Sequence, residues 1–581
     1  MMLDNQQQEA VQTESKRALV LAGAGSGKTR VLIERIAHLI ETQHVSPYEI
    51  MAFTFTRKAA GEIRNRLVER IGNKAYHIQM GTMHALALAM LQRFGDVIGI
   101  KGKQLTVYGD WEEQFLLKDT AIAMGVYNGK SWKPKKGDVD DVFFAYYSCG
   151  VEPSALDPVH DLFHAFIARC KENNSMTYGG LLAGMRLLIP TMAEYLKIEH
   201  ILVDEIQDID VLQWKIIREM EATFQAKLYV VGDLDQSIYE WRGAIPGYLI
   251  EHEKEFDIFR LQTNYRSEAS IVAAANKLIS YNQDRLPMEM VPTITKADGS
   301  LVDVWTNMDS EALCDYLARS STADRVNETK HPFTVLARNH ALLEKLSMLL
   351  EADKIEHVYI GKDTALTNSE EFRRFHAFLK LSVNEFDNFS FLLVKDILGI
   401  TQSEYAKLRL DAASAGASHF QLWSELEEAD WPKPDQSLAN VVAEILTLYK
   451  WHFDLNPILD FIKKYIESAK DDVTIADYLD WLATIDVQDE VKESYEGLVL
   501  MTIHAAKGLE WDTVIVAGCN EEILPAKQAI RNNDIEGERR LFYVAMTRAK
   551  DNLILTIRPE VTYTGDRKYE NPESRFIKEA I

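Results

Sequence analysis

The stretch Ala22-Gly-Ala-Gly-Ser-Gly-Lys-Thr29 decides the fold of this chain, because it has the form of a phosphate-binding loop. The residues before it, Ala18–Leu21, form an apolar run typical of a buried strand, and Arg30–Ile40 after it carries apolar residues at helical spacing. Between a strand and a helix, the backbone N–H groups of such a loop cradle phosphates. Lys28 is expected to reach the terminal phosphates, and the Thr29 hydroxyl to help hold Mg²⁺.

A second string supplies two carboxylates. His200-Ile-Leu-Val-Asp-Glu205 is an apolar run that ends in Asp204 and Glu205, as expected where a buried parallel strand delivers acids to the carboxyl edge of a sheet. Asp204 is expected to hold Mg²⁺, directly or through water, and Glu205 to orient and deprotonate the attacking water. Considered without the loop, Asp204 and Glu205 are also compatible with a solvated acidic turn. Together with the loop, the pair predicts a nucleoside triphosphatase.

The length and composition are those of a multidomain globular chain. With 581 residues the chain is too long for one hydrophobic core, and 47% apolar and 26% charged residues are ordinary values. No apolar stretch approaches membrane-spanning length and the N-terminus is polar, which predicts a cytoplasmic protein without membrane contact. The four cysteines form no C-x-x-C pair, so neither a zinc site nor a cluster site is expected.

The charge does not by itself favour a nucleic-acid partner. The chain has 88 acidic and 64 basic residues, a formal net charge of −24, so no broad basic face is predicted. A groove that threads a single strand needs only local positive charge and stacking aromatic rings, so this acidity does not exclude such binding.

Short apolar runs typical of buried strands fall into two groups. The first group is Ala18–Leu21, Ile50–Phe55, Ile201–Val203 and Leu228–Val231; the second is Phe333–Ala337, Leu498–Ile503, Val514–Ala517 and Leu553–Thr556. Two α/β sheets account for them. Mainly helical patterns at about 85–195 and 366–490 interrupt the two groups, and the latter contains a capping-box candidate at Thr401 and Glu404.

Further strings, in a fixed order from residue 3 to about 557, resemble the signature set of the UvrD/Rep family of superfamily 1 DNA helicases. They are Leu3–Gln7, Ala52–Ala60, Gly81–His84, Asp204–Asp208, Val231–Ala244, Gln262–Ser267, Met501–Glu510 and Glu538–Arg548. The chain departs from the usual pattern at Arg57 and Glu240, and Met176–Leu181 replaces a segment that is usually acidic.

The resemblance implies an α/β fold with two RecA-like parallel-sheet motor domains, each with an inserted mainly helical domain. The expected limits are 1–84 and 196–261 for the first motor domain, 85–195 for its insertion, 262–365 and 491–581 for the second motor domain, and 366–490 for its insertion. All strings expected at the ATP site lie outside 366–490, so this insertion is expected to regulate unwinding rather than to power stepping.

The resemblance also implies the residues that bind ATP. Gln7 would recognise the adenine edge, Tyr265 would stack on the base, and Glu510 would approach the ribose or phosphates. Gln236 would sense the γ-phosphate, while Arg266 and Arg548 resemble arginine fingers. The loop residues expected to contact the nucleotide are Ala22, Gly23, Ala24, Gly25, Ser26, Gly27, Lys28, Thr29 and Arg30.

A second set of residues is expected to bind DNA. Phe55, Tyr239 and Trp241 would stack on bases, with a core position as the alternative for Tyr239. Residues expected to contact phosphates or to relay the nucleotide state are Thr56, Thr82, His84, Arg242, Thr502 and His504.

The function implied is that of an ATP- and Mg²⁺-dependent helicase or translocase moving 3′→5′ on single-stranded DNA, in repair, recombination or replication. Its expected partners are single-stranded DNA, 3′-tailed duplex DNA and a possible protein of a repair, replication or defence complex. The alternative is a nucleotide-gated DNA-binding ATPase subunit of a repair or antiphage-defence complex that does not unwind DNA on its own.

Overall fold

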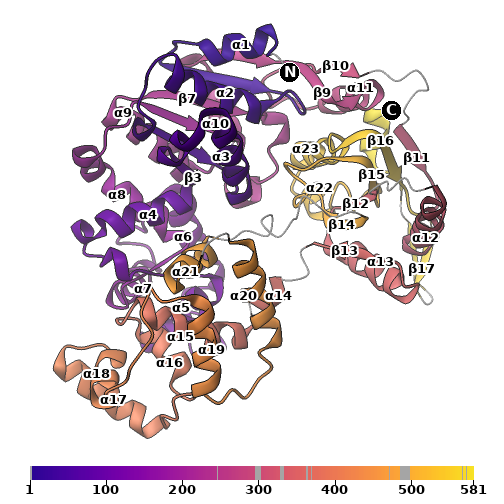
Figure 1. Ribbon diagram of the computed structural model, residues 1–581. Helices are drawn as coiled ribbons and strands as arrows, with labels where there is room; N and C mark the ends of the chain where they lie inside the picture. The colour runs from indigo at the N-terminus through magenta and orange to yellow at the C-terminus, as the bar shows by residue number, and fades with distance from the viewer. Residues whose placement is uncertain are drawn as a thin grey trace.

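The computed structural model describes residues 3–244, 246–294, 302–327, 333–360, 364–367, 369–469, 472–484, 497–559, 561–564, 567–570 and 572–581. Its architecture is two parallel α/β sheets, each flanked by helices, with two mainly helical insertions that lie together below the first sheet in Figure 1. The predicted fold class is confirmed.

The first sheet contains six parallel strands in the order β3-β2-β6-β7-β1-β8. Its strands are β1 (Arg17–Ala22), β2 (Ile50–Thr54), β3 (Gln79–Thr82), β6 (His200–Val203), β7 (Lys227–Gly232) and β8 (Asp257–Leu261). Alternate residues of β1 enter two different cores, since Val20 packs with α1 (Asn5–Gln12), α2 (Lys28–Glu41) and α3 (Arg57–Ile71), whereas Leu19 packs on the other face with α9 (Val211–Phe224). We call this unit the first sheet domain.

The second sheet also has six parallel strands, in the order β11-β16-β15-β12-β14-β13. Its strands are β11 (Val302–Trp305), β12 (Phe333–Ala337), β13 (His357–Tyr359), β14 (Leu498–Thr502), β15 (Trp511–Ala517) and β16 (Ala549–Thr556). One face packs on α11 (Ala269–Ile279) and α23 (Ile535–Met546), and the other on α12 (Ser310–Asn327) and α13 (His340–Ala352). We call this unit the second sheet domain.

The two insertions are helical, as predicted. The first insertion contains α4 (Met83–Phe94), α5 (Asp110–Ala123), α6 (Lys136–Cys149), α7 (His160–Glu172) and α8 (Gly180–Tyr195), with a small sheet of β4 (Thr106–Tyr108) and β5 (Ser175–Thr177). The second insertion contains α15 (Glu370–Val383), α16 (Asn388–Val394), α17 (Gln402–Ala415), α18 (His419–Leu426), α19 (Leu438–Leu448), α20 (Asn456–Ser468) and α21 (Ile475–Ala483). The capping box of Thr401 and Glu404 is confirmed at the start of α17.

The insertions pack directly against each other, which the sequence did not predict. Glu112 of the first insertion is buried and pairs with two cations of the second, Arg373 at 2.8 Å and Lys380 at 2.6 Å. Nearby, the Tyr108 hydroxyl donates to Oδ1 of Asp387 at 2.6 Å. Because unpaired buried charges are costly, these contacts favour the two insertions moving as one unit.

The remaining helices and strands connect these parts. They are α10 (Pro246–Glu251), β9 (Thr263–Glu268), β10 (Val291–Ile294), α14 (Thr364–Thr367), α22 (Lys527–Arg531), β17 (Val561–Thr564), β18 (Arg567–Glu570) and α24 (Arg575–Ala580). In the part of the chain that the structure describes, no helix is both long and apolar enough to span a bilayer. The domain limits given above stay a proposal: the limit at 84 and 85 falls in the first turn of α4, and that at 490 and 491 lies outside the described residues.

Candidate active site and nucleic-acid groove

A cleft with a volume of about 720 Å³ lies between the two sheet domains, and most residues expected to bind ATP line it. The first sheet domain contributes Gly23, Gly25, Ser26, Gly27, Lys28, Thr29, Arg30, Asp204, Glu205 and Gln236. The strand β9 contributes Tyr265 and Arg266, and the second sheet domain contributes Glu510 and Arg548. Strings more than 500 residues apart in the chain therefore face one space.

The glycine-rich loop follows β1 and ends where α2 begins at Lys28. Gly25 has a φ of +69° and Gly27 a φ of +86°, conformations that favour glycine. A Cβ atom added at Gly25 would also lie 2.6 Å from the Cβ of Arg266. Two expected loop residues, Ala22 and Ala24, do not line the cleft, because both are buried in the cores beneath it.

Lys28 and Glu205 face each other across the cleft floor, with Nζ 3.4 Å from Oε2. Glu205 has a φ of +51°, a conformation uncommon for a residue with a side chain, and it is the second residue after the end of β6. Burial opposes ionisation of Glu205, yet the ammonium groups of Lys28 and Lys507 lower its pKa. The neighbouring Asp204 has a raised pKa because of burial and the Glu205 charge.

Asp204 and the Thr29 hydroxyl suit a divalent cation. Both lie in the cleft lining, and burial and the Glu205 charge raise the pKa of Asp204 despite the nearby Lys28 ammonium, so a bound cation would stabilise the ionised carboxylate. Among the described residues, no group of three or more His, Cys, Asp or Glu side chains has the arrangement of a metal site. The ion would therefore depend on phosphate oxygens and water for its other ligands, as Mg²⁺ commonly does.

Two arginines line the cleft, Arg266 on β9 and Arg548 directly before β16. Arg548 is 1% exposed and donates from Nη2 to Oε1 of Gln236 at 3.0 Å, so it bridges the two sheet domains. Burial and the charge of Arg266 lower the pKa of Arg548 to about 9. Arg266 donates from Nε to Oε2 of Glu510 at 2.5 Å. Both arginines thus line the same cleft as Lys28.

Tyr265 lines the cleft, whereas Gln7 is buried against the phosphate loop and is not part of the cleft lining. The buried Gln7 amide donates from Nε2 to the Ser26 carbonyl at 3.0 Å. Tyr265 donates its hydroxyl proton to Oδ2 of Asp4 at 2.5 Å, and its backbone N–H to the Gly25 carbonyl at 2.9 Å. An amide and an aromatic ring beside the phosphate loop are the groups that a purine base needs.

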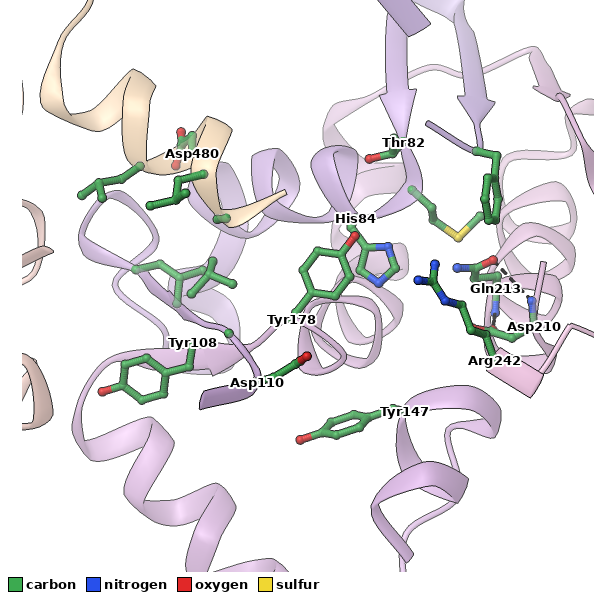
Figure 2. Close-up of a pocket in the computed structure, with 18 of the residues that line it drawn as sticks. Thr82, His84, Tyr108, Asp110, Tyr147, Tyr178, Asp210, Gln213, Arg242 and Asp480 are labelled. Carbon is green, nitrogen blue, oxygen red and sulfur yellow. Dashed lines mark hydrogen bonds between the residues drawn. The ribbon is translucent and has the colours of Figure 1, made fainter. Parts of the chain in front are cut away.

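A second cavity, the groove, has a volume of about 820 Å³ and is lined by the first sheet domain and both insertions (Figure 2). The expected DNA residues in its lining are Phe55, Thr82, His84, Tyr239, Trp241 and Arg242. Three residues, Phe55, Asp204 and Asp208, line both the groove and the cleft, so the two cavities share a wall. Of the other expected residues, Thr56 lines the cleft, and Thr502 and His504 line neither cavity.

The expected base-stacking aromatic residues differ in exposure. Trp241 is 64% exposed, and the Arg242 guanidinium lies 4.8 Å from its ring centroid. Tyr239 is only 3% exposed; it stacks on Phe55 at 4.9 Å and donates its hydroxyl proton to the His504 carbonyl at 3.2 Å. The Tyr239 ring therefore packs in the core and supports Phe55, which favours a core position, the alternative given for this residue, although Tyr239 also lines the groove.

Three threonines expected to contact DNA phosphates accept backbone N–H groups. Thr56 accepts from Ala59 at the start of α3, Thr82 from Ala85 at the start of α4, and Thr502 from Ala505. A threonine hydroxyl that accepts a cap hydrogen bond still has its own proton to donate to a phosphate. The N-termini of α3 and α4 also carry the partial positive charge that favours anions.

One groove residue, Tyr178, was not predicted. Its ring stacks on His84 with centroids 4.0 Å apart and planes inclined by 7°, and Figure 2 shows the two side chains together in the groove. Tyr178 is 37% exposed, and both members of the pair line the groove. Its position in Met176–Leu181, where the chain departs from the family pattern, was the signal that could have identified it.

Comparisons with known proteins agree with this geometry. The family model described as the UvrD/REP helicase N-terminal domain matches residues 3–257, and the UvrD-like helicase C-terminal domain matches residues 259–422 and 454–560. The ATP-dependent DNA helicase PcrA of Bacillus subtilis (strain 168) is 29% identical over 99% of this chain and 85% of the relative. The proteins of the same name from Staphylococcus aureus (strain Mu50) and Staphylococcus epidermidis (strain ATCC 12228) are 28% and 27% identical, each over 99% of this chain and 86% of the relative.

The two family matches together span most of the chain and every string that lines the cleft. The chain belongs to the UvrD/Rep family of helicases.

Proposed function

We propose that this chain is an ATP-driven motor that moves 3′→5′ along single-stranded DNA and separates strands of 3′-tailed duplexes, in repair, recombination or replication. The observation that carries the proposal is the shared wall between the cleft and the groove, formed by Phe55, Asp204 and Asp208. Because these residues line both cavities, a movement of the wall when the nucleotide changes also changes the lining of the groove. The names of the relatives, ATP-dependent DNA helicases, support the same function.

The cleft residues have separable roles in hydrolysis. The loop N–H groups and Lys28 bind the phosphates, and Mg²⁺ held by Thr29 and Asp204 would neutralise charge on them. When Lys28 turns to a phosphate, it leaves Glu205, 3.4 Å away in this structure, with less positive charge beside it. The pKa of Glu205 then rises, and the carboxylate becomes a better base for the attacking water.

Arg266 and Arg548 stabilise charge that develops on the transferred phosphoryl group. Arg548 belongs to the second sheet domain, and Arg266 pairs with Glu510 of that domain, so contact of both arginines with phosphate would draw the two sheet domains together. Gln236, already bonded to Arg548, senses the γ-phosphate from the first sheet domain. When the phosphate leaves after hydrolysis, these contacts are lost and the two sheet domains can separate again.

The groove grips the strand by stacking and by phosphate contacts. The exposed Trp241 and the Tyr178–His84 pair offer ring faces for bases, while Arg242 and the capping threonine Thr82 suit phosphates. Thr56, which was also expected to contact DNA, lines the cleft instead. Base stacking is tolerant of sequence, so little base specificity is expected.

The proposal is tested by ATP hydrolysis of the purified protein with and without a single-stranded oligonucleotide. Stimulation by DNA in the wild type, together with loss of hydrolysis in Glu205→Gln, is the expected result. Hydrolysis that is indifferent to DNA contradicts the proposed coupling, and hydrolysis without strand separation supports only a nucleotide-gated binding subunit.

A further inference from the structure

Asp4 contacts the aromatic residue of the cleft from outside the cleft lining. Its Oδ2 accepts the hydroxyl proton of Tyr265 at 2.5 Å, although Asp4 is not itself part of the lining. A hydrogen bond of this length to a carboxylate is charge-assisted and stronger than a bond between neutral groups. Burial and the hydrogen bond to Asp4 raise the pKa of Tyr265, so its hydroxyl stays protonated and remains the donor.

The Tyr265 side chain is held at both of its ends. Its backbone N–H donates to the Gly25 carbonyl of the phosphate loop at 2.9 Å, and its hydroxyl reaches Asp4 at the start of α1. A second contact keeps α1 close to this strand, since Gln6 accepts the backbone N–H of Gln262 at 3.0 Å. The ring is 36% exposed and lines the cleft, so its orientation depends on these contacts rather than on burial.

Asp4 also holds the side chain of Gln7. The backbone N–H of Asp4 donates to Oε1 of Gln7 at 3.2 Å, and Nε2 of Gln7 donates to the Ser26 carbonyl at 3.0 Å. One residue therefore contacts both groups that are expected to recognise the base, the Tyr265 ring and the Gln7 amide.

A purely structural role as a helix cap is the competing interpretation. Asp4 is the N-cap residue of α1 and forms a capping box with Gln7, which alone explains an aspartate at this position. The cap uses Oδ1, which accepts the Gln7 backbone N–H at 2.8 Å, whereas Tyr265 is bound by the other oxygen, Oδ2. Because each oxygen has its own partner, the geometry favours a second role beside the cap.

We propose that Asp4 is a positioning residue for the nucleobase, which fixes the Tyr265 ring before ATP binds so that the base stacks on a ring that is already ordered. This inference rests on the proposed function. It deepens that function by assigning affinity for the base, and not for the phosphates, to a residue that touches neither.

The test compares Asp4→Ser, Tyr265→Phe and the double variant with the wild type in steady-state ATP hydrolysis at saturating oligo-dT. Serine keeps an oxygen for the cap but has no second oxygen for Tyr265, and phenylalanine keeps the ring without its hydroxyl. Each single variant is expected to raise the KM for ATP by about 2- to 10-fold, the cost of ordering one side chain on binding. The kcat is expected to change less than about twofold, because the groups that act on the phosphates are intact.

Inorganic triphosphate separates positioning of the base from damage to the loop. It carries phosphates and no base, so its Ki as a competitor of ATP is expected to change less than about twofold in either single variant. The double variant is expected to match the single variants, since both cut the same hydrogen bond. Asp454→Ser is the matched control, because this exposed aspartate lies outside both cavities and accepts the Asn456 backbone N–H at the start of α20 at 3.0 Å.

Three results overturn the inference. They are an unchanged KM for ATP in Tyr265→Phe, a Ki for triphosphate that rises as much as the KM for ATP, and effects on KM that multiply in the double variant. Tyr265→Phe leaves α1 unaltered, so it decides the outcome where Asp4→Ser lowers the Tm. A wild-type protein that does not hydrolyse ATP overturns the proposed function itself, whereas equal KM values in wild type and variants overturn only the role of Asp4.

Discussion

Arg548 of the second sheet domain donates a hydrogen bond across the cleft to Gln236 of the first, from Nη2 to Oε1 at 3.0 Å. The guanidinium is held in place by the carbonyls of Val544 and Leu509, at 3.0 and 3.1 Å. A closing contact between the sheet domains is therefore already formed, and the group that forms it is rigid and buried.

Arg548→Ala is expected to lower kcat for ATP hydrolysis by about 10³- to 10⁵-fold, the usual value of an arginine finger. The Kd for ATP should change much less, because the group acts on charge that develops in the transition state. Steady-state kinetics and nucleotide titration measure the two effects, with the exposed Arg531→Ala as control. Equal losses in affinity and rate would indicate ground-state phosphate binding instead.

Lys28→Ala and Glu205→Gln are expected to fail at different steps. Lys28→Ala loses ATP affinity because the phosphates lose their contact with the Lys28 ammonium group. Glu205→Gln keeps the Lys28 ammonium group and removes the carboxylate that lies 3.4 Å from it, so the variant should bind ATP. Because the variant lacks the proposed base, it should not hydrolyse ATP. Titration with a fluorescent ATP analogue and a hydrolysis assay separate them. Hydrolysis above about a tenth of the wild-type rate in Glu205→Gln would remove this residue from the role of base.

Trp241→Ala and Tyr239→Ala are a matched pair of aromatic truncations. Truncation of the exposed Trp241 should weaken binding of oligo-dT by about 1–3 kcal/mol, which is about a 5- to 150-fold rise in Kd, with little change in Tm. Truncation of the buried Tyr239 should instead lower the free energy of unfolding by about 3–5 kcal/mol. A Trp241→Ala protein that melts early and loses all activities together would show that Trp241 supports the fold rather than the strand.

Glu112→Gln tests the contact between the two insertions. The substitution removes the carboxylate that Arg373 and Lys380 share, and loss of one member of a buried ion pair costs about 3–5 kcal/mol. Chemical denaturation should show this loss, while exposed Glu425→Gln should not. The same contact makes deletion of residues 366–490 a poor test of regulation, because the deletion would expose this face of the first insertion. An unchanged denaturation midpoint in Glu112→Gln would show that the insertions are not held together by this pair.

His376 predicts a dependence of stability on pH. Burial lowers its folded-state pKa to about 3 from the usual 6.5, and the ring contacts the Phe372 carbonyl and the Tyr478 hydroxyl. Between these two values the unfolded chain binds one more proton than the folded chain, so stability falls as the pH is lowered below 6.5. The contribution of this one residue is about 1.4 kcal/mol per pH unit.

His376→Gln keeps a donor and an acceptor but cannot be protonated. The free energy of unfolding, measured by denaturant titration between pH 7 and 5, should therefore fall less steeply in the variant than in the wild type. Parallel slopes for the two proteins would contradict the assignment of a neutral, buried His376.

The structure contains all eight strands that the sequence predicted, and the four that it missed in the two six-stranded sheets have a common cause. The missed strands β3, β8, β11 and β13 are the edge strands of the two sheets. In the edge strand β8 (Asp257–Leu261), only the last residue is buried. Such a strand lacks the continuous apolar run that identifies interior strands. Edge strands are fixed by the tertiary context rather than by their own pattern.

The cleft was predicted more completely than the groove for a similar reason. Loop and strand-end residues such as Lys28 and Glu205 carry local signals, because their chemistry requires a fixed local backbone. Whether an aromatic ring such as Tyr239 faces solvent, or Tyr178 faces a groove, depends on which distant element packs on it. The contact of Glu112 with Lys380 joins residues 268 positions apart, and no local pattern encodes it.

The central claim, that the two sheet domains drive directional movement on one strand, is tested most directly by strand displacement with the purified protein, ATP and Mg²⁺. Two duplexes of identical sequence are compared, one with a 3′ single-stranded tail and one with a 5′ tail, and Glu205→Gln serves as the inactive control. The account predicts displacement of the 3′-tailed duplex in the wild type alone. Displacement that favours the 5′ tail, or that persists in Glu205→Gln, would contradict it.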